Sequence, residues 1–181
     1  MPSISRLWPK EQYKMKAAFC GSFDPITLGH MDLITRASSL FEEVIVFVTP
    51  NSGKNALFTN EQKVDWIAQA CAHLPKVRAC IQEGLAVEAC RKAGAEVLIR
   101  GLRNETDLGY EQNMAFMNYS LDSTVETFCL FCRPEYAFIS SSNVRELLKY
   151  HQSIEAFVPE CVFQALQPEF SGSAKQQEAE F

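Results

Sequence analysis

The feature that most constrains this chain is the alternation of two hydrophobic patterns over residues 16–150. Short apolar runs, typical of strands buried on both faces, recur at residues 16–21, 44–48, 77–81, 97–99 and 125–131. Apolar residues at helical spacing follow each run, in residues 29–41, 59–71, 85–93, 110–121 and 142–150. Strands that alternate with helices favour a parallel sheet with right-handed crossovers. The sequence therefore predicts an α/β protein, a single doubly wound Rossmann-like domain with a five-stranded parallel sheet.

Both ends of the 181-residue chain lack this pattern. Residues 1–14 hold prolines and scattered polar residues without a hydrophobic period, which predicts a flexible N-terminal extension. Residues 168–181 are rich in small and polar residues, a composition typical of a disordered C-terminal tail. The predicted domain therefore spans residues 15–167, a length that suits one domain.

The charge of the chain limits its partners. The formal net charge is −5, whereas a broad nucleic-acid surface is usually basic, so we expect no nucleic-acid partner. An acidic chain can still bind anions through a few cations that are focused in a cleft. No apolar run approaches the ~18 residues of a membrane span, and no signal peptide pattern is present. We therefore expect no membrane partner and a cytoplasmic location.

The seven cysteines agree with a cytoplasmic location. Most of them lie in apolar runs, where a thiol behaves as a small hydrophobic group, and we expect them to be reduced. Cys129 and Cys132 form a C-x-x-C pair, but a zinc site would need a second pair or two spaced histidines. We therefore expect these two in the core or at a strand end, and we predict no metal ligands in the chain.

Ligands of parallel sheets bind at the carboxyl ends of the strands, so the loops there are the first place to look for functional residues. The first such loop runs from Gly21, which permits a tight exit from the strand, to Gly29 and His30, which opens the next helix. A helix start offers N–H groups and partial positive charge to a phosphate, and an imidazole there can donate to the same anion. The alternative is that His30 only caps the helix.

Cations follow the second and fourth predicted strands. Lys54 lies in a polar loop from which it can reach a phosphate, although such a lysine is more often solvated. Arg100 and Arg103 follow an apolar strand directly, and guanidinium groups fit the geometry of phosphate oxygens. The alternative is that they form surface ion pairs with Glu105 or Asp107, which are common and weak.

Three serines precede the last predicted helix, at Ser140, Ser141 and Ser142. They form a strong helix-start signal and also present hydroxyl and N–H groups to an anion, although capping needs only one of them. His73 and His151 lie near the ends of their helices, where the helix dipole favours a histidine. We therefore assign both histidines a structural role.

Together and in this order, the loops resemble a nucleotidyltransferase superfamily. Its H/T-x-G-H motif is similar to T-L-G-H from Thr27, and its I-S-S-S or I-S-T-T motif is similar to I-S-S-S from Ile139. Within it, the closer match is to the bacterial phosphopantetheine adenylyltransferases, and the resemblance covers about residues 16–167. The supporting stretches are G-S-F-D-P-I-T-L-G-H from Gly21, L-I-R-G-L-R from Leu98, Tyr110-Glu111, and F-I-S-S-S from Phe138.

The resemblance implies an enzyme of coenzyme A synthesis, with ATP and 4′-phosphopantetheine as substrates and dephospho-coenzyme A and pyrophosphate as products. It implies Mg²⁺ as the cofactor and a homohexameric assembly. His30 and Lys54 would be the catalytic residues, with His30 on the α-phosphate. The acceptor would be bound by Ser22, Lys54, Ala86 and Arg100. ATP would be bound by Ser22, Phe23, His30, Gly101, Leu102, Arg103, Glu111, Tyr136, Ala137, Phe138, Ile139, Ser140, Ser141 and Ser142.

Two other interpretations remain open to test. The first is a related enzyme, either a cytidylyltransferase for a phosphorylated alcohol or a nicotinamide mononucleotide adenylyltransferase. Thr27 in place of the first motif histidine, together with the R-G-L-R loop, argues against both. The second is a non-catalytic nucleotide-sensing module, which would predict the loss of His30 or Arg103, and both are present. Ala86 departs from the family pattern, which often has a larger apolar residue at that position.

Overall fold

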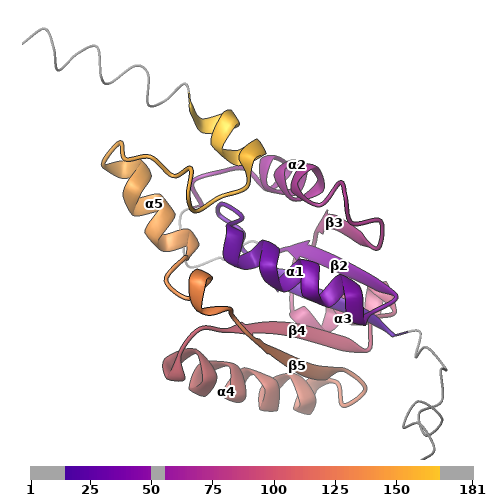
Figure 1. Ribbon diagram of the computed structural model, residues 1–181. Coiled ribbons are helices and arrows are strands. Elements are labelled where there is room, and N and C mark those ends of the chain that lie inside the picture. Colours follow the sequence, from indigo (N-terminus) through magenta and orange to yellow (C-terminus); the bar gives the residue numbers. More distant parts are fainter. Residues whose placement is uncertain (1–14, 50–55, 168–181) are drawn as a thin grey trace, which may run out of the picture.

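The computed structural model describes residues 15–49 and 56–167, and these contain one sheet of five parallel strands (Figure 1). The strands lie in the order β3-β2-β1-β4-β5. Their bounds are Lys16–Gly21 for β1, Glu43–Val48 for β2, Val77–Ile81 for β3, Val97–Leu102 for β4 and Glu126–Phe131 for β5. The predicted α/β fold with a five-stranded parallel sheet is therefore confirmed.

Helices connect the strands and cover both faces of the sheet. Their bounds are Leu28–Leu40 for α1, Asn60–Ala70 for α2, Ala86–Ala93 for α3, Glu105–Leu121 for α4 and Ser141–Lys149 for α5. A short 3₁₀ turn, η2 at Pro134–Tyr136, precedes α5, and a further helical segment occupies residues 160–167. In Figure 1, α1, α2 and α5 lie on one side of the sheet and α4 lies on the other.

Local signals explain where several helices begin and end. Thr59 and Gln62 form the predicted capping box of α2: each side chain accepts the other residue's backbone N–H, at 3.2 and 2.9 Å. Helix α3 ends at Gly94, whose φ of 63° lies in the left-handed region that glycine adopts at little cost.

Two predicted boundaries differ from the structure near the fourth strand. β4 continues to Leu102 because Gly101 and Leu102 pair with the facing residues of β5, so Arg100 lies within the strand and not in a loop. α4 begins at Glu105, well before the apolar helical pattern starts, because Asn104 accepts the N–H of Asp107 and caps it. A polar cap and first turn thus lengthen the helix where hydrophobic spacing gave no signal.

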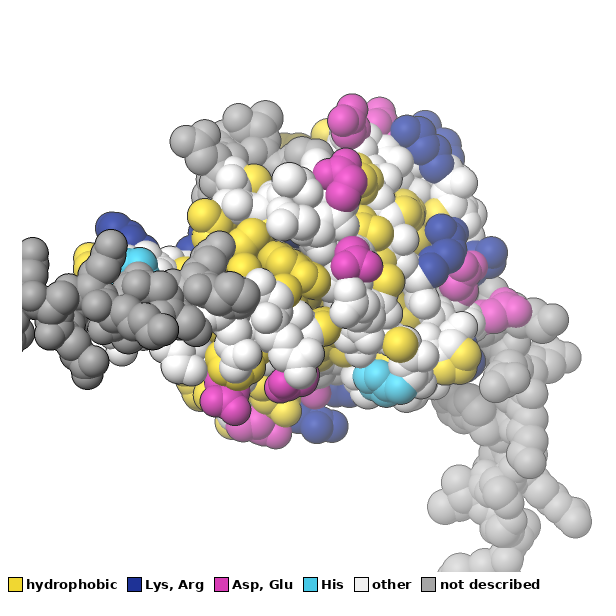
Figure 2. All heavy atoms as spheres, turned by 90° about the horizontal axis from the view of Figure 1, so that it is seen from above, with side chains coloured by type: hydrophobic (Ala, Val, Ile, Leu, Met, Phe, Trp, Pro, Cys, Tyr) yellow, Lys and Arg dark blue, Asp and Glu magenta, His cyan; other side chains and the backbone are white. Residues whose placement is uncertain are grey.

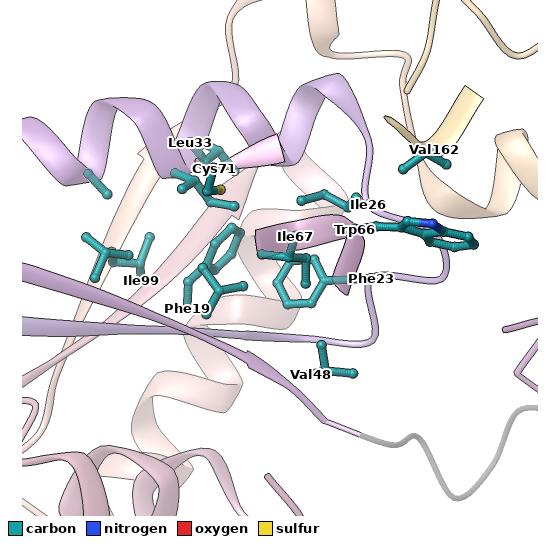
Figure 3. Close-up of a cluster of buried hydrophobic side chains, with 14 of the residues drawn as sticks. Phe19, Phe23, Ile26, Leu33, Val48, Trp66, Ile67, Cys71, Ile99 and Val162 are labelled. Carbon is teal, nitrogen blue, oxygen red and sulfur yellow. The ribbon is translucent and has the colours of Figure 1, made fainter. Parts of the chain in front are cut away.

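The central strands separate two hydrophobic clusters. Alternate residues of β1 point to opposite faces: Ala17 and Phe19 enter the larger cluster, and Ala18 and Cys20 the smaller one. The larger cluster lies under α1, α2, α5 and the segment 154–166. Figure 3 shows Leu33 of α1, Ile67 of α2 and Val162 of that segment among its side chains. The smaller cluster lies under α3. Burial on both faces explains why β1 and β2 read as continuous apolar runs.

The surface mixes the two signs of charge. On the face seen in Figure 2, acidic and basic side chains lie interspersed among uncharged ones. Within residues 15–49 and 56–167, no helix is long and apolar enough to cross a membrane. The predicted extension at 1–14 and tail at 168–181 lie outside the described residues, so the domain limits of 15 and 167 stay predictions.

Candidate active site

A cavity of about 330 Å³ opens at the carboxyl ends of β1 and β4. In this strand order β1 pairs with β2 on one side and with β4 on the other, so the direction of winding reverses between β1 and β4. Such a switch point is where open α/β sheets bind their ligands. The cavity is walled by the β1–α1 loop, the end of β4, α4 and the start of α5.

The cavity brings together most of the residues that the sequence singled out. Those that line it are Ser22, Phe23, His30, Arg100, Gly101, Arg103, Glu111, Ile139, Ser140, Ser141 and Ser142. Five others do not line it, namely Ala86, Leu102, Tyr136, Ala137 and Phe138. Ala86 is the first residue of α3 and packs against the smaller cluster, while Leu102 is buried and Phe138 is exposed. Lys54 lies outside the described residues. The ligand contacts predicted for all of these residues stay predictions.

His30 is the third residue of α1 and not its opening residue, and it takes part in a capping box with Thr27. The Thr27 N–H donates to His30 Nδ1 at 3.1 Å, and the His30 N–H donates to Thr27 Oγ1 at 3.4 Å. A ring nitrogen that accepts a backbone N–H carries no proton, so the proton of a neutral imidazole lies on Nε2. His30 therefore caps the helix, and the same bond leaves it with a donor for a ligand in the cavity.

Burial keeps this imidazole neutral. Loss of hydration, with a smaller contribution from the nearby Arg103 cation, lowers the pKa of His30 to about 4. The rings of Phe23 and His30 meet edge to face, with centroids 5.0 Å apart, and exclude water from one side of the imidazole. Near neutral pH the ring therefore acts as a hydrogen-bond donor without a net charge.

The start of α1 offers fewer free N–H groups than the sequence suggested. Leu28 N–H donates to the carbonyl of Phe157 at 2.9 Å, and the His30 N–H is used in the capping box. The segment after α5 and the side chain of the N-cap residue Thr27 satisfy donors that a free helix terminus would present to an anion. The dipole of α1 still points at the cavity, but its amides are largely occupied.

The three serines at the start of α5 have three different partners, and Ser141 and Ser142 belong to the first turn of the helix itself. Ser140 caps the helix by accepting the N–H of Asn143 at 3.1 Å. Ser141 Oγ donates to the carbonyl of Pro25 at 2.8 Å, and Ser142 Oγ accepts from Arg145 at 3.2 Å. Capping therefore uses one serine, as predicted. Ser141 joins the start of α5 to the first loop, and Ser142 bonds a cation of the same helix.

Both arginines of the R-G-L-R stretch are paired with carboxylates of α4. Arg100 donates to both oxygens of the buried Glu111, each at 2.6 Å, and Arg103 donates to both oxygens of Asp107 at 2.9 and 3.1 Å. Loss of hydration acts to lower the pKa of Arg100, but its bonds to Glu111 outweigh this and raise it. Arg103 thus forms the ion pair with Asp107 that the alternative named, whereas Arg100 pairs with Glu111, which the alternative did not name. Both guanidinium groups nevertheless line the cavity.

Three charged residues of the cavity wall were missed by the sequence analysis: Asp24, Lys63 and Arg145. Lys63 is 2% exposed and lies 3.4 Å from Asp24, and Arg145 donates to the Asp24 carbonyl at 2.7 Å. One signal was available, because Lys63 lies four residues before Ile67 and so shares its buried helix face. For Asp24 and Arg145 the partners come from distant elements, which no local pattern reveals.

The two thiols beside the cavity are poor nucleophiles. Burial raises the pKa of Cys20 to about 12, and burial also raises the pKa of Cys132. Because the thiolate is the reactive form, neither side chain is activated for covalent catalysis. The site therefore offers fixed donors and cations and not an activated nucleophile.

Comparison with known proteins shows the family to which this sequence belongs. A cytidylyltransferase-like family model matches residues 18–147. The phosphopantetheine adenylyltransferase of Lactiplantibacillus plantarum is 48% identical over 150 residues, which are 83% of this chain and 92% of that protein. This chain belongs to the phosphopantetheine adenylyltransferase family.

Further relatives match this chain over nearly the full length of their own sequences. The phosphopantetheine adenylyltransferase of Levilactobacillus brevis is 42% identical over 86% of this chain and 97% of that protein, and that of Symbiobacterium thermophilum is 41% identical over 87% and 97%. The crystal structure of a provisionally named nicotinate-nucleotide adenylyltransferase from Vibrio parahaemolyticus superposes with a TM-score of 0.67. It covers 87% of this chain and 94% of its own at 17% identity, so that likeness speaks for the fold alone.

We expect His30 of this phosphopantetheine adenylyltransferase family member to titrate with a pKa of about 4. The unfolded chain binds a proton at this residue below its ordinary pKa of 6.5, whereas the folded chain does not until about 4. Unfolding therefore takes up a proton in this window, and His30 makes the protein less stable as the pH falls through it. Nuclear magnetic resonance (NMR) titration of the histidine ring signals measures the pKa directly.

The variant His30→Gln provides the control, because Gln at the third helix position keeps a capping acceptor without a titrating ring. The free energy of unfolding in urea should fall less between about pH 6.5 and pH 5 in this variant than in the parent chain. A His30 signal that titrates near its ordinary value would contradict a neutral, half-buried imidazole that has lost much of its hydration.

Proposed function

We propose that the chain transfers the adenylyl group of ATP to 4′-phosphopantetheine, which gives dephospho-coenzyme A and pyrophosphate. One observation carries this proposal: a single cavity at the switch point of the sheet brings the imidazole of His30, two arginines and the start of α5 together. The named activity of relatives that are 41–48% identical over most of the chain supports the same conclusion.

The arrangement suits this chemistry because the reaction needs no deprotonating base. The acceptor phosphate already carries a nucleophilic oxygen, so the protein has to align two anions and stabilise the charge that develops at phosphorus. The Nε2–H of His30 can donate to an oxygen of the α-phosphate as that centre becomes five-coordinate. A neutral donor held by a backbone N–H is pre-oriented, and such fixed donors are the usual source of transition-state stabilisation.

We assign the remaining roles by the resemblance of the motifs. Lys54 and Arg100 would bind the acceptor's phosphate, Ser22 would lie at the join between the two substrates, and Ala86 would contact the pantetheine arm. The ATP site would comprise Ser22, Phe23, His30, Gly101, Leu102, Arg103, Glu111 and residues 136–142. Because Arg100 pairs with Glu111 and Arg103 with Asp107, each arginine must bind a phosphate while it keeps its carboxylate partner. Each guanidinium has five donors, so it can keep a carboxylate on one edge while it turns another toward a phosphate.

Magnesium fits the site as part of a Mg²⁺–ATP complex. The cavity carboxylates of Asp24, Asp107 and Glu111 are each paired with a cation of the protein. In the part of the chain that the structure describes, no cluster of three or more metal-ligating side chains occurs. Mg²⁺ usually keeps waters and phosphate oxygens as ligands, so the triphosphate would hold the ion and these cations would hold the triphosphate.

We further propose that the chain assembles as a homohexamer in the cytoplasm. Helix α4 buries only Glu111 and Asn118, and strand β5 is an edge of the sheet. Large apolar side chains are exposed on these two elements, namely Leu108, Tyr110, Phe116, Met117, Tyr119, Leu121, Phe128 and Phe131. An exposed apolar surface of this kind is typical of a protein interface. All seven cysteines are free thiols, which suits a reducing compartment.

A panel of substrates tests the activity. We expect pyrophosphate release with Mg²⁺, ATP and 4′-phosphopantetheine, and little release when CTP replaces ATP or nicotinamide mononucleotide replaces the acceptor. Chelation of the metal should stop the reaction. Turnover with either alternative substrate at an equal or higher kcat/KM would assign the chain to another activity of the superfamily.

His30→Ala tests the proposed transition-state role. We expect ATP affinity to change by a few-fold and kcat to fall on the order of a hundredfold or more, because the lost donor acts mainly in the transition state. The capping box is lost as well, which should cost about 1 kcal/mol of stability.

Gln62→Ala provides the matched control for His30→Ala. It removes the corresponding side chain from the capping box of α2, so it should lose similar stability and keep its kcat. Equal kcat losses in the two variants would assign the effect of His30→Ala to helix capping.

The apolar surface of α4 and β5 predicts a substitution that disrupts assembly. The parent chain should have six times the mass of one chain by size-exclusion chromatography with light scattering. Phe116→Asp, at a position 65% exposed on α4, should shift the protein to smaller species because a charge is then buried in the interface. Leu40→Asp, at a position 59% exposed on α1, is the control and should leave the mass unchanged. A monomeric parent chain would contradict the proposed assembly.

A further inference from the structure

Lys63 occupies a position that stability alone does not explain. It lies on the face of α2 that also carries Trp66 and Ile67, and its side chain is 2% exposed. An ammonium group at such a position loses its hydration, and a buried ion pair often fails to return that cost in full. An apolar side chain would fill the same space at lower cost. The charge of Lys63 therefore needs another explanation.

The contacts of Lys63 lead to Asp24 in the β1–α1 loop. Lys63 Nζ lies 3.4 Å from Asp24 Oδ1, and both side chains are buried. The two Asp24 oxygens also accept the N–H groups of Leu57 and Phe58, at 2.9 and 3.1 Å. Arg145 of α5 donates to the Asp24 carbonyl at 2.7 Å. The carboxylate of Asp24 thus joins the first loop to the segment before α2 and to α2 itself, and its backbone carbonyl joins the loop to α5.

The residue before Asp24 has an unusual backbone conformation. Phe23 has a φ of 44°, in the left-handed region that residues with a side chain adopt only at a cost. Its ring is 1% exposed and packs edge to face on Phe19, at 5.4 Å, and on His30, at 5.0 Å. Strain of this kind persists where surrounding contacts hold it, and it is concentrated at functional sites. Asp24 follows the strained residue Phe23 directly in the chain, so the contacts of Asp24 act next to this strained turn.

We propose that Lys63 is a positioning residue for adenylyl transfer. It holds Asp24, and through Asp24 the strained turn at Phe23, in the arrangement that presents the His30 ring to the cavity. This inference rests on the proposed function, because it concerns the same transfer step. Lys63 acts on the reaction through Asp24 and Phe23 and not through a bond of its own to substrate.

The test compares Lys63→Met, which keeps the length of the side chain without its charge, with Lys63→Arg, which keeps the charge. Lys63→Met should lower kcat on the order of 10- to 100-fold, the effect of a misplaced catalytic group. Its KM for both substrates should stay within about threefold, because ground-state binding is not what is lost. Lys63→Arg should keep most of the parental kcat. Lys92→Met, which changes an exposed lysine of α3, is the control and should match the parent chain.

A second readout does not depend on turnover. The His30 ring signals of the ligand-free protein, followed by NMR, should shift in Lys63→Met and return in Lys63→Arg. A role in stability alone would lower the melting temperature without moving these signals. If the parent chain shows no adenylyl transfer, the proposed function fails, while the His30 signals still decide whether Lys63 positions the ring.

A double-mutant cycle that combines Lys63→Met with Asp24→Asn tests whether Lys63 acts through Asp24. If Lys63 acts through Asp24, the double variant should have a kcat close to that of Asp24→Asn alone, because the second change removes a contact that is already lost. The double variant also removes both buried charges together, so it carries the test if Lys63→Met does not fold.

Three results would overturn the proposal. One is parental kcat and unchanged His30 signals in Lys63→Met. Another is a raised KM for one substrate with kcat and the His30 signals unchanged, which would make Lys63 a direct substrate ligand. The third is full additivity of the Lys63→Met and Asp24→Asn effects on kcat.

Discussion

The burial of β1 between β2 and β4 is the constraint on which the rest of the structure depends. Because β1 pairs in parallel with both neighbours, and both of its faces are covered, its direction and register fix those of the central sheet. The chain must leave β1 and β4 at the same edge, and the helices that follow start there. The cavity, the β1–α1 loop and the R-G-L-R stretch meet at this edge for that reason.

In this acidic chain, carboxylate partners hold the cations of the cavity in place, and these cations are not part of a broad basic surface. Lys63, Arg100 and Arg103 each line the cavity beside a carboxylate partner, so the ligand-free site carries little uncompensated charge. Pairing keeps the cations in place before an anion arrives, which reduces the reorganisation that binding would otherwise require. The same pairs connect α2 to the β1–α1 loop and α4 to the end of β4, so they serve the fold and the site together.

At His30, the hydrogen bond that caps the helix also prepares the ring for its proposed function. The bond from the Thr27 N–H satisfies a helix start, and the same bond fixes the tautomer that leaves a donor on Nε2. Burial against Phe23 removes water and keeps the imidazole neutral near physiological pH. A structural interaction therefore sets both the orientation and the charge of the group that we place on the α-phosphate.

The sequence by itself determined the fold class, the order of the strands and helices along the chain, and about half of the residues that line the cavity. Hydrophobic period and polar caps are local signals, and the T-L-G-H and I-S-S-S motifs mark the two loops that meet at the cavity. The tertiary structure alone decided which cation pairs with which carboxylate, because Arg100 with Glu111 and Lys63 with Asp24 join different elements across the fold. It also decided the pKa of His30 and the extension of β4, since both depend on neighbours that only folding brings close.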